Sequence, residues 1–367
     1  MEAPGTAIRL NPFKGLEGPD GVRVPWSPYG RMLAERPNFT LDPLYHAGCY
    51  YVQDSSAMYV GHVFRKLVQP GAAAPGRILR VLDLCAAPGG KTTDLAASLR
   101  EMCGDGFLLV SNEVMKARAA VLRDNAGIWG DPAVRVCSAD PSVLGRALAG
   151  FFDVIVADVP CSGEGMFRKD ARARAEWSPS VVELCAARQK RILADAWPAL
   201  RHGGLLIYST CTYEEKENDA NLEWAAEELG GEIIEPENEF AEYGVQLTRR
   251  GNLLVAGTVP GEGQWVGALR KTSAAPCSRN PQIPGLLRAE ETDRALAYGY
   301  SPECPLVELD LGDALKFLHR DTICLPGEPK GLIVVAYHAH PLGFVKNLGT
   351  RCNNLLPRNR RILMDIL

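Results

Sequence analysis

Short apolar runs alternate with helix-like segments between residues 78 and 229, and this alternation most constrains the fold. We predict strands at 78–84, 107–111, 133–137, 152–157 and 205–209, and a late strand at 265–269. Helical spacing predicts helices at 92–99, 116–125 and 217–229, and a long amphipathic helix from the Ser178 and Pro179 capping signal to Gly203 and Gly204. Strands that alternate with helices in this way form a largely parallel sheet with helices on both faces. The sequence therefore predicts an α/β fold with a doubly wound core.

Composition shifts on either side of the core predict further units. Residues 1–60 are rich in Pro and aromatics and predict a small, irregular αβ subdomain, and the core extends over 61–272. A Pro- and Ser-rich linker at 273–285 precedes a small domain at 286–367. That last segment has short β-like runs and ends in a tail with one acid and five Lys or Arg residues from position 345 onward. We expect one basic face there.

Charge and cysteine usage exclude several classes of protein. The net charge is -4, so any nucleic-acid site must rest on local basic patches. No apolar run approaches the roughly 20 residues of a membrane span, and the N-terminus lacks a signal-like segment, which predicts a cytoplasmic protein. The 11 cysteines form no C-x-x-C pair, which argues against a disulfide framework or a zinc site. His338 and His340 have no acidic or Cys partner nearby in the sequence, and we predict no metal.

A glycine-rich turn follows the first predicted strand and predicts a nucleotide-like ligand. Its residues are Ala86, Ala87, Pro88, Gly89, Gly90 and Lys91. A phosphate-binding P-loop is one interpretation, but that pattern needs a glycine where Cys85 stands and an acid for magnesium. The other is S-adenosylmethionine, with Glu113 accepting hydrogen bonds from the ribose and Asp140 reaching the adenine. Each acid alone has a simpler alternative as a helix N-cap. Three such features at successive strand ends favour S-adenosylmethionine.

Two thiols and an acid follow the next two strands. Asp158 ends the fourth predicted strand, Cys161 lies in the Gly- and Pro-rich loop after it, and Cys211 follows the fifth strand. Parallel strands present their carboxyl ends at one edge of a sheet, so we expect the three side chains in one site. A structural role is the alternative for each cysteine. The residues alone do not decide which thiol is the nucleophile.

Three motifs together resemble the Sun-type (Nol/Nop/Sun) RNA cytosine-C5 methyltransferases. They are the segments 82–92, 158–165 and 209–212, and the resemblance covers about residues 40–271. Residues 166–170, 177–179 and 188–189 are similar to the branch that acts on bacterial small-subunit rRNA, and 341–346, 353–354 and 357 are similar to its PUA-like domain. Val159 replaces the usual Ala. The chain begins almost at the segment 8–12, so we expect the helices that usually precede this segment to be short or absent.

The resemblance implies a Rossmann-like methyltransferase core with an N-terminal RNA-binding subdomain and a C-terminal PUA-like one. The activity would be methylation of cytosine C5 in RNA, with 16S rRNA or the 30S subunit as partner. Apart from the resemblance, we expect a monomer. Cys211 would be the nucleophile, and Asp158 would be the acid at N3 and a cofactor contact. Cys161 would assist C5 deprotonation or release of the enzyme from RNA. Arg118 would also contact the cofactor.

Four cations are predicted RNA contacts, with solvated surface charge as the alternative. They are Arg168, Lys169, Lys346 and Arg351. Two alternative functions remain at this point: a tRNA methyltransferase and a catalytically silent RNA-binding homologue. An amino-methylating enzyme is disfavoured, because the (Asn/Asp)-Pro-Pro-(Tyr/Phe) motif of that class is absent.

Overall fold

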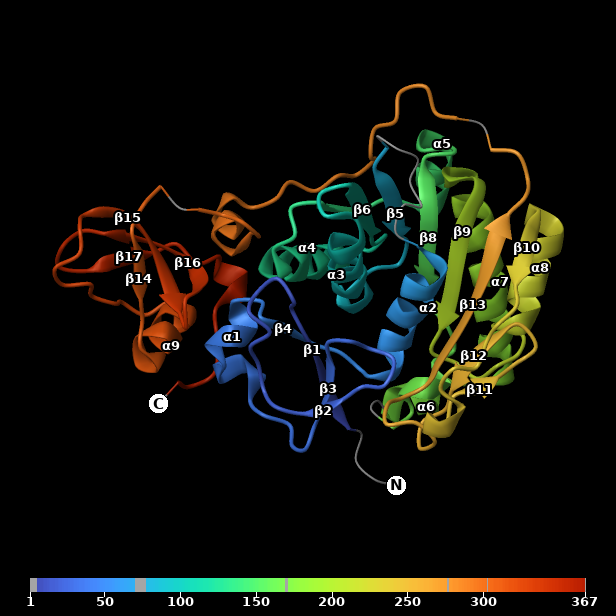
Figure 1. Cartoon of the computed structure of the whole chain (residues 1–367), viewed down its shortest axis with the longest axis horizontal. Coiled ribbons are helices and arrows are strands. Elements are labelled where there is room, and N and C mark those ends of the chain that lie inside the picture. Colours follow the sequence, from blue (N-terminus) through green and yellow to red (C-terminus); the bar gives the residue numbers. More distant parts are fainter. Residues whose placement is uncertain (1–4, 70–76, 169–170, 276, 302, 367) are drawn as a thin grey trace.

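The computed structural model of the chain describes residues 5–69, 77–168, 171–275, 277–301 and 303–366. Within these residues the strands form three sheets, with nine strands in the largest and four in each of the others. Figure 1 shows the nine-stranded sheet at the right, the C-terminal sheet at the left, and the N-terminal sheet below and between them. No helix in the described residues is long and apolar enough to cross a membrane.

The nine-stranded sheet confirms the predicted doubly wound fold. Its parallel strands are β5 (Leu79–Asp83), β6 (Phe107–Asn112), β7 (Val134–Cys137), β8 (Phe152–Asp158) and β9 (Leu200–Thr210). Antiparallel strands extend it beyond β9: β10 (Gly231–Ile234), β11 (Gln246–Leu247), β12 (Gly251–Leu254) and β13 (Gln264–Lys271). The order is β11-β12-β13-β9-β8-β5-β6-β7, and β10 also pairs with β13. The sequence predicted only one strand of the antiparallel part.

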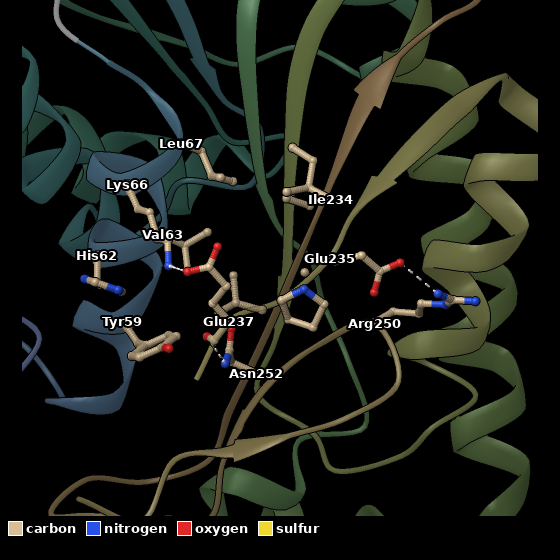
Figure 2. A pocket seen from close by; sticks show the side chains of 14 residues that line it. Tyr59, His62, Val63, Lys66, Leu67, Ile234, Glu235, Glu237, Arg250 and Asn252 are labelled. Carbon is tan, nitrogen blue, oxygen red and sulfur yellow. Dashed lines mark hydrogen bonds and ion pairs between the residues drawn. The ribbon is translucent and has the colours of Figure 1, made fainter. Parts of the chain in front are cut away.

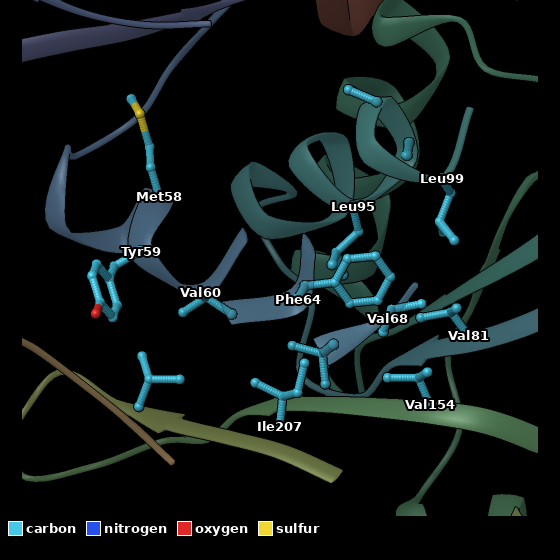
Figure 3. Close-up of a cluster of buried hydrophobic side chains, with 14 of the residues drawn as sticks. Met58, Tyr59, Val60, Phe64, Val68, Val81, Leu95, Leu99, Val154 and Ile207 are labelled. Atoms are coloured by element: carbon cyan, nitrogen blue, oxygen red, sulfur yellow. The ribbon is translucent and has the colours of Figure 1, made fainter. Parts of the chain in front are cut away.

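Helices cover both faces of this sheet, because its strands are apolar on both sides. The helices α2 (Tyr59–Leu67), α3 (Gly90–Cys103) and α4 (Lys116–Trp129) cover one face, and α5 (Pro141–Ala147), α7 (Pro179–Ala196) and α8 (Asp219–Leu229) cover the other. Val81, Val154 and Ile207 pack with α2 and α3, as Figure 3 shows. The neighbouring residues Leu82 and Ile155 point to the opposite face. This alternation divides the core into two layers.

The predicted C-terminal end of the long helix is wrong. α7 ends at Ala196, a single 3-10 turn covers Trp197–Ala199, and Leu200 already belongs to β9. Pro198 has no N–H to continue the helical hydrogen bonds, so the helix stops before it. Gly203, with φ +72, lies inside β9, where the register with β8 shifts.

The two smaller sheets belong to the chain ends. The N-terminal sheet contains β1 (Thr6–Leu10), β2 (Val22–Arg23), β3 (Gly30–Leu33) and β4 (Tyr50–Val52), with α1 (Pro43–His46) beside it. The C-terminal sheet contains β14 (Leu306–Glu308), β15 (Gly331–Tyr337), β16 (His340–Asn347) and β17 (Cys352–Asn354), with α9 (Leu311–His319). One buried apolar cluster joins both units, since it contains Ile8 and Leu10 together with Phe317 and Val335.

The segment after the predicted linker lies along the edge strand β7. Gly285 accepts a hydrogen bond from the N–H of Ser138 at 2.9 Å, and Leu287 donates to Val136 at 3.0 Å. Leu286 forms an isolated β-bridge with Cys137. The end of the linker is therefore anchored to the central sheet.

Candidate active site

The candidate site lies at the carboxyl ends of β5, β8 and β9. The chain runs from β5 through β6 to β7 and then returns to β8 on the other side of β5. In open α/β sheets, ligands bind where the strand order reverses in this way. The predicted glycine-rich loop, Asp158 and both thiols are all at this edge.

The glycine-rich loop connects β5 to the first turn of α3. Ala86 and Ala87 are buried, and the N–H of Ala86 donates to the carbonyl of Asn112 at 2.8 Å. Gly89 has φ +117, a conformation that favours glycine, and Gly90 begins α3. The side chain of Asn125 donates to the carbonyl of Pro88 at 2.7 Å. The loop thus holds the backbone at the start of α3 in the form that a nucleotide-like ligand needs.

Glu113 and Arg118 form the predicted ribose side of the site. The buried Glu113 accepts the N–H of Met115 at 2.9 Å and pairs with Arg118 at 3.2 Å. Arg118 also donates to the carbonyl of Ala87 at 2.8 Å, which links Glu113 to the loop. A carboxylate has about four acceptor positions, so Glu113 retains acceptors for ribose hydroxyls. This set of groups fits S-adenosylmethionine.

Asp140 is the N-cap of α5, which is the structural role that the sequence left open as an alternative to cofactor binding. Its Oδ1 accepts the N–H of Ser142 at 2.9 Å and the hydroxyl at 2.6 Å. These hydrogen bonds lower the pKa of Asp140. The residue is exposed at the end of β7, and its contact with adenine stays a prediction.

Lys91 and Asp158 form an ion pair at the centre of the site. The Nζ of Lys91 lies 2.6 Å from Oδ2 of Asp158, while Oδ1 accepts from Ser209 at 2.8 Å and Gln264 at 3.2 Å. Burial opposes the charge on Lys91, but Asp158 and Cys211 outweigh it and raise the pKa of the ammonium. Lys91, predicted only as a cofactor contact, therefore also lies beside the predicted acid.

Cys161 and Cys211 are neighbours, as expected from adjacent strand ends. Their Sγ atoms are 3.0 Å apart. The hydrogen bond from Cys161 lowers the pKa of Cys211, and Lys91 acts in the same direction. The hydrogen bond to Cys211 and burial raise the pKa of Cys161 well above its usual value. The geometry thus favours a thiolate on Cys211, a choice that the residues alone left open.

The loops that carry the two thiols are joined directly. Ser162 Oγ lies 2.9 Å from Thr212 Oγ1, and the N–H of Gly165 donates to the carbonyl of Cys211 at 2.8 Å. A Cβ on Gly165 would lie 2.6 Å from the Cα of Gly263 and 2.7 Å from that carbonyl oxygen. Glycine is required here because the backbones approach so closely.

Sequence reasoning missed several polar residues of the site. Asp83, at the end of β5, is buried, and burial raises its pKa to about 7. Gln264 and Glu217 come from segments where the sequence suggested only secondary structure. Asp83 could have been noticed as an acid at a strand end, the signal that selected Asp158. Glu217 offered no such signal.

The predicted RNA contacts do not come together at the thiols. Arg168 pairs with the buried Glu262 at 3.0 Å and donates to the carbonyl of Gly261 at 2.9 Å. Lys169 lies outside the described residues. Lys346 is exposed on β16 and Arg351 in the loop before β17, and Figure 1 places the C-terminal sheet at the opposite end of the molecule from β9. Their RNA contacts stay predictions.

Metal ligation finds no support in the described part of the chain, where no group of three or more His, Cys, Asp or Glu side chains is placed to hold an ion. His338 and His340 have no acidic neighbour in the sequence, but the fold brings the distant Glu17 within 3.6 Å and 3.4 Å of them. All 11 cysteines lie in described segments and are free thiols.

A separate pocket lies between α2 and the antiparallel strands (Figure 2). Tyr59, His62 and Lys66 line one side, and Glu237 and Asn252 line the other. Lys66 pairs with Glu237 across it at 2.8 Å. None of its lining residues was predicted as a site residue, and it is distinct from the strand-end site.

Three sequence families match successive parts of the chain. They are described as the N-terminal domain of 16S rRNA methyltransferase RsmF, at residues 1–55, as 16S rRNA methyltransferase RsmB/F, at residues 73–248, and as the methyltransferase RsmF PUA domain, at residues 304–362. The three matches follow the order of the three sheets.

Curated relatives carry the name ribosomal RNA small subunit methyltransferase F. The chain is 36% identical over 287 residues to the protein from Escherichia coli O139:H28 and 37% identical over 286 residues to that from Escherichia coli O7:K1. Each alignment covers 75% of this chain and 57% of the relative. The chain therefore spans a little over half the length of these relatives.

Solved structures show the same fold. A methyltransferase homolog protein from Pyrococcus horikoshii matches with a TM-score of 0.60 at 24% identity, over 74% of this chain and 87% of that one. NSun6 from Pyrococcus horikoshii, solved with the S-adenosylmethionine analogue SFG, matches with a TM-score of 0.53 at 22% identity, over 65% and 57%. The family is S-adenosylmethionine-dependent, as the glycine-rich loop predicted. The chain thus belongs to the RsmB/F methyltransferase family and carries the N-terminal and PUA domains of the RsmF branch.

Proposed function

We propose that this chain methylates carbon 5 of a cytosine in small-subunit (16S) rRNA. The observation that carries the proposal is the pair of thiols beside the Lys91–Asp158 ion pair, at the strand ends where the cofactor loop lies. Bound S-adenosylmethionine would supply an electrophilic methyl group. The family and its PUA domain support rRNA as the substrate.

The chemistry explains why a thiolate is needed. Cytosine C5 is a poor nucleophile, and addition of the Cys211 sulfur at C6 makes C5 electron-rich. A proton delivered at N3 offsets the charge that develops in the ring. Asp158 is the acid in this proposal, and it takes the proton that it delivers to N3 from the Lys91 ammonium, with which it is paired. After methyl transfer a base removes the C5 proton, and the C6–sulfur bond breaks.

We assign Cys161 to the cleavage of the C6–sulfur bond, where its protonated thiol donates a hydrogen bond to the departing Cys211 sulfur. Its Sγ is 3.0 Å from that of Cys211, so it lies next to the bond that must break. The cytosine must leave any base stack to reach these groups, so the substrate is a flipped or single-stranded cytosine.

Methyl transfer from radiolabelled S-adenosylmethionine to 16S rRNA, 30S subunits and tRNA tests the activity. Cys211→Ala should abolish turnover, and Cys161→Ala should accumulate a covalent RNA–protein adduct that survives denaturing gels. Cys277→Ala, at an exposed thiol, is the matched control and should behave as wild type.

Near wild-type turnover of Cys211→Ala would refute the assignment of the nucleophile. No transfer to any RNA by the wild-type chain would leave a silent RNA-binding homologue. Bisulfite mapping of the product identifies the methylated cytosine, and label found only in tRNA would overturn the rRNA assignment.

A further inference from the structure

Glu217 is a buried carboxylate beneath the loop that carries Cys161. Its side chain is fully buried just before α8, and its Oε2 accepts the N–H of Ser162 at 3.1 Å. Ser162 directly follows Cys161. The proposed reaction gives Glu217 no role, yet burial of a carboxylate is costly unless it is hydrogen-bonded.

Gln189 of α7 ties this carboxylate to the other side of the same thiol. Its amide donates to Glu217 at 2.6 Å and to the carbonyl of Pro160, the residue before Cys161, at 3.0 Å. The amide oxygen accepts from Tyr208 at 3.1 Å. Cys161 is therefore held from both sides by one buried network centred on Glu217 and Gln189.

The charges around the two thiols are unequal. The Glu217 carboxylate binds the backbone N–H of the residue after Cys161. The hydrogen bond to Cys211 and burial are the main causes of the raised pKa of Cys161, and the charge of Glu217 acts in the same direction. Lys91 faces Cys211 and lowers the pKa of that thiol. The N–H of Cys211, 3.3 Å from the Cys161 sulfur, acts in the opposite direction on Cys161, but the other effects outweigh it.

Other titratable groups face this cluster from the elements packed around it. They are Asp158 of β8, Tyr208 of β9, Cys185 of α7 and Glu214 of the loop after β9. Burial raises the pKa of Tyr208, Cys185 and Glu214, which disfavours their charged forms. Burial raises the pKa of Glu217 as well, but the hydrogen bonds from Ser162 and Gln189 act in the opposite direction and favour its carboxylate form. Glu217 is the acid bound to the Cys161 loop.

We propose that Glu217 is a positioning residue that keeps Cys161 protonated and thereby leaves the ionised sulfur on Cys211. This inference rests on the proposed function for its catalytic meaning, because a reaction with one nucleophile and one helper requires the two thiols to stay in different protonation states. The difference is set by a carboxylate that touches neither substrate nor cofactor.

Thiol alkylation tests this without RNA or cofactor. Only the thiolate reacts with iodoacetamide, so peptide mass spectrometry over a range of pH reports which sulfur is ionised. In the wild-type chain Cys211 should be alkylated first and Cys161 only at higher pH. In Glu217→Gln the ratio of the Cys161 rate to the Cys211 rate should rise about tenfold, which corresponds to one pKa unit.

Two further variants separate charge from packing. Glu217→Asp retains the charge and should preserve the wild-type order of alkylation. Asp219→Asn removes another buried carboxylate nearby, one bound to Thr248 and Arg250 instead of the thiol loops, and should also preserve it. Circular dichroism establishes that each variant is folded.

An unchanged ratio in folded Glu217→Gln overturns the proposal. If that variant does not fold, two results still overturn it: alkylation of Cys161 before Cys211 in the wild type, or a reversed order in Glu217→Asp. A shifted ratio in a chain that transfers no methyl group would uphold this inference and refute the proposed function, so the two failures are distinguishable.

Discussion

At the scale of single residues, the sequence was most informative where reactive side chains follow predicted strands. The placement of Asp158, Cys161 and Cys211 at one edge follows from parallel topology alone. The protonation of these groups does not, because it depends on burial and on distant partners. Asp83 shows this limit, since its Oδ2 accepts from Thr92 at 2.7 Å while burial raises its pKa to about 7.

Asp83→Asn should change the pH dependence of stability. The folded chain holds a proton on Asp83 up to about pH 7, and the unfolded chain releases it near 3.8. The stability from this group is therefore full below the lower value and is lost as pH rises through the higher one. The free energy of unfolding of the variant, from urea denaturation, should rise relative to that of the wild type between pH 4 and 8, by at most about 4 kcal/mol. Parallel curves would contradict the buried, protonated state.

At the scale of elements, local signals located most helices and strands, but contacts between loops remained invisible. Pro198 was a readable signal that ends α7 before β9, and the helical spacing of Leu200 concealed it. The pairing of Arg168 with Glu262 joins residues 94 positions apart. No local sequence pattern indicates such a contact. The sequence therefore suggested that Arg168 contacts RNA.

We expect the Arg168–Glu262 pair to stabilise the fold and not to bind RNA. Arg168→Ala and Glu262→Gln should each lower the free energy of unfolding by about 1–3 kcal/mol, because each leaves a charged group without its hydrogen bonds. Both should reduce RNA affinity to a similar extent and leave its salt dependence unchanged. If Arg168 instead binds phosphate, only Arg168→Ala will flatten the salt dependence of binding.

At the scale of the whole molecule, composition indicated three units but not how they join. The predicted boundaries at 60, 272 and 285 stay predictions, and the fold adds that the terminal units share one buried cluster. Asn11 also joins distant parts of the chain, since its side chain donates to the carbonyl of Trp129 at 3.2 Å and accepts from the hydroxyl of Tyr298 at 2.9 Å. Such contacts depend on the assembled fold, which hydrophobic periodicity does not encode.

We expect Arg360 to stabilise the packing of the C-terminal tail against the rest of the chain. Its buried guanidinium pairs with Asp293 at 2.8 Å and Asp124 at 3.8 Å. Arg360→Ala should lower the free energy of unfolding by about 2–4 kcal/mol, because two acids lose their partner in a poorly hydrated site. Arg361→Ala, at the exposed neighbour, is the control and should have little effect in the same urea titration. Equal effects of the two substitutions would exclude this stabilising role of Arg360.

The segment 285–287 along β7 also bears on how this protein behaves at high concentration. A bare edge strand presents unpaired N–H and C=O groups that a second chain can use to extend the sheet. Here the protein's own backbone occupies that edge through Gly285, Leu286 and Leu287. The segment therefore shields this edge from pairing with a second chain, and cleavage or an insertion within it would expose β7 as a template for intermolecular β-pairing.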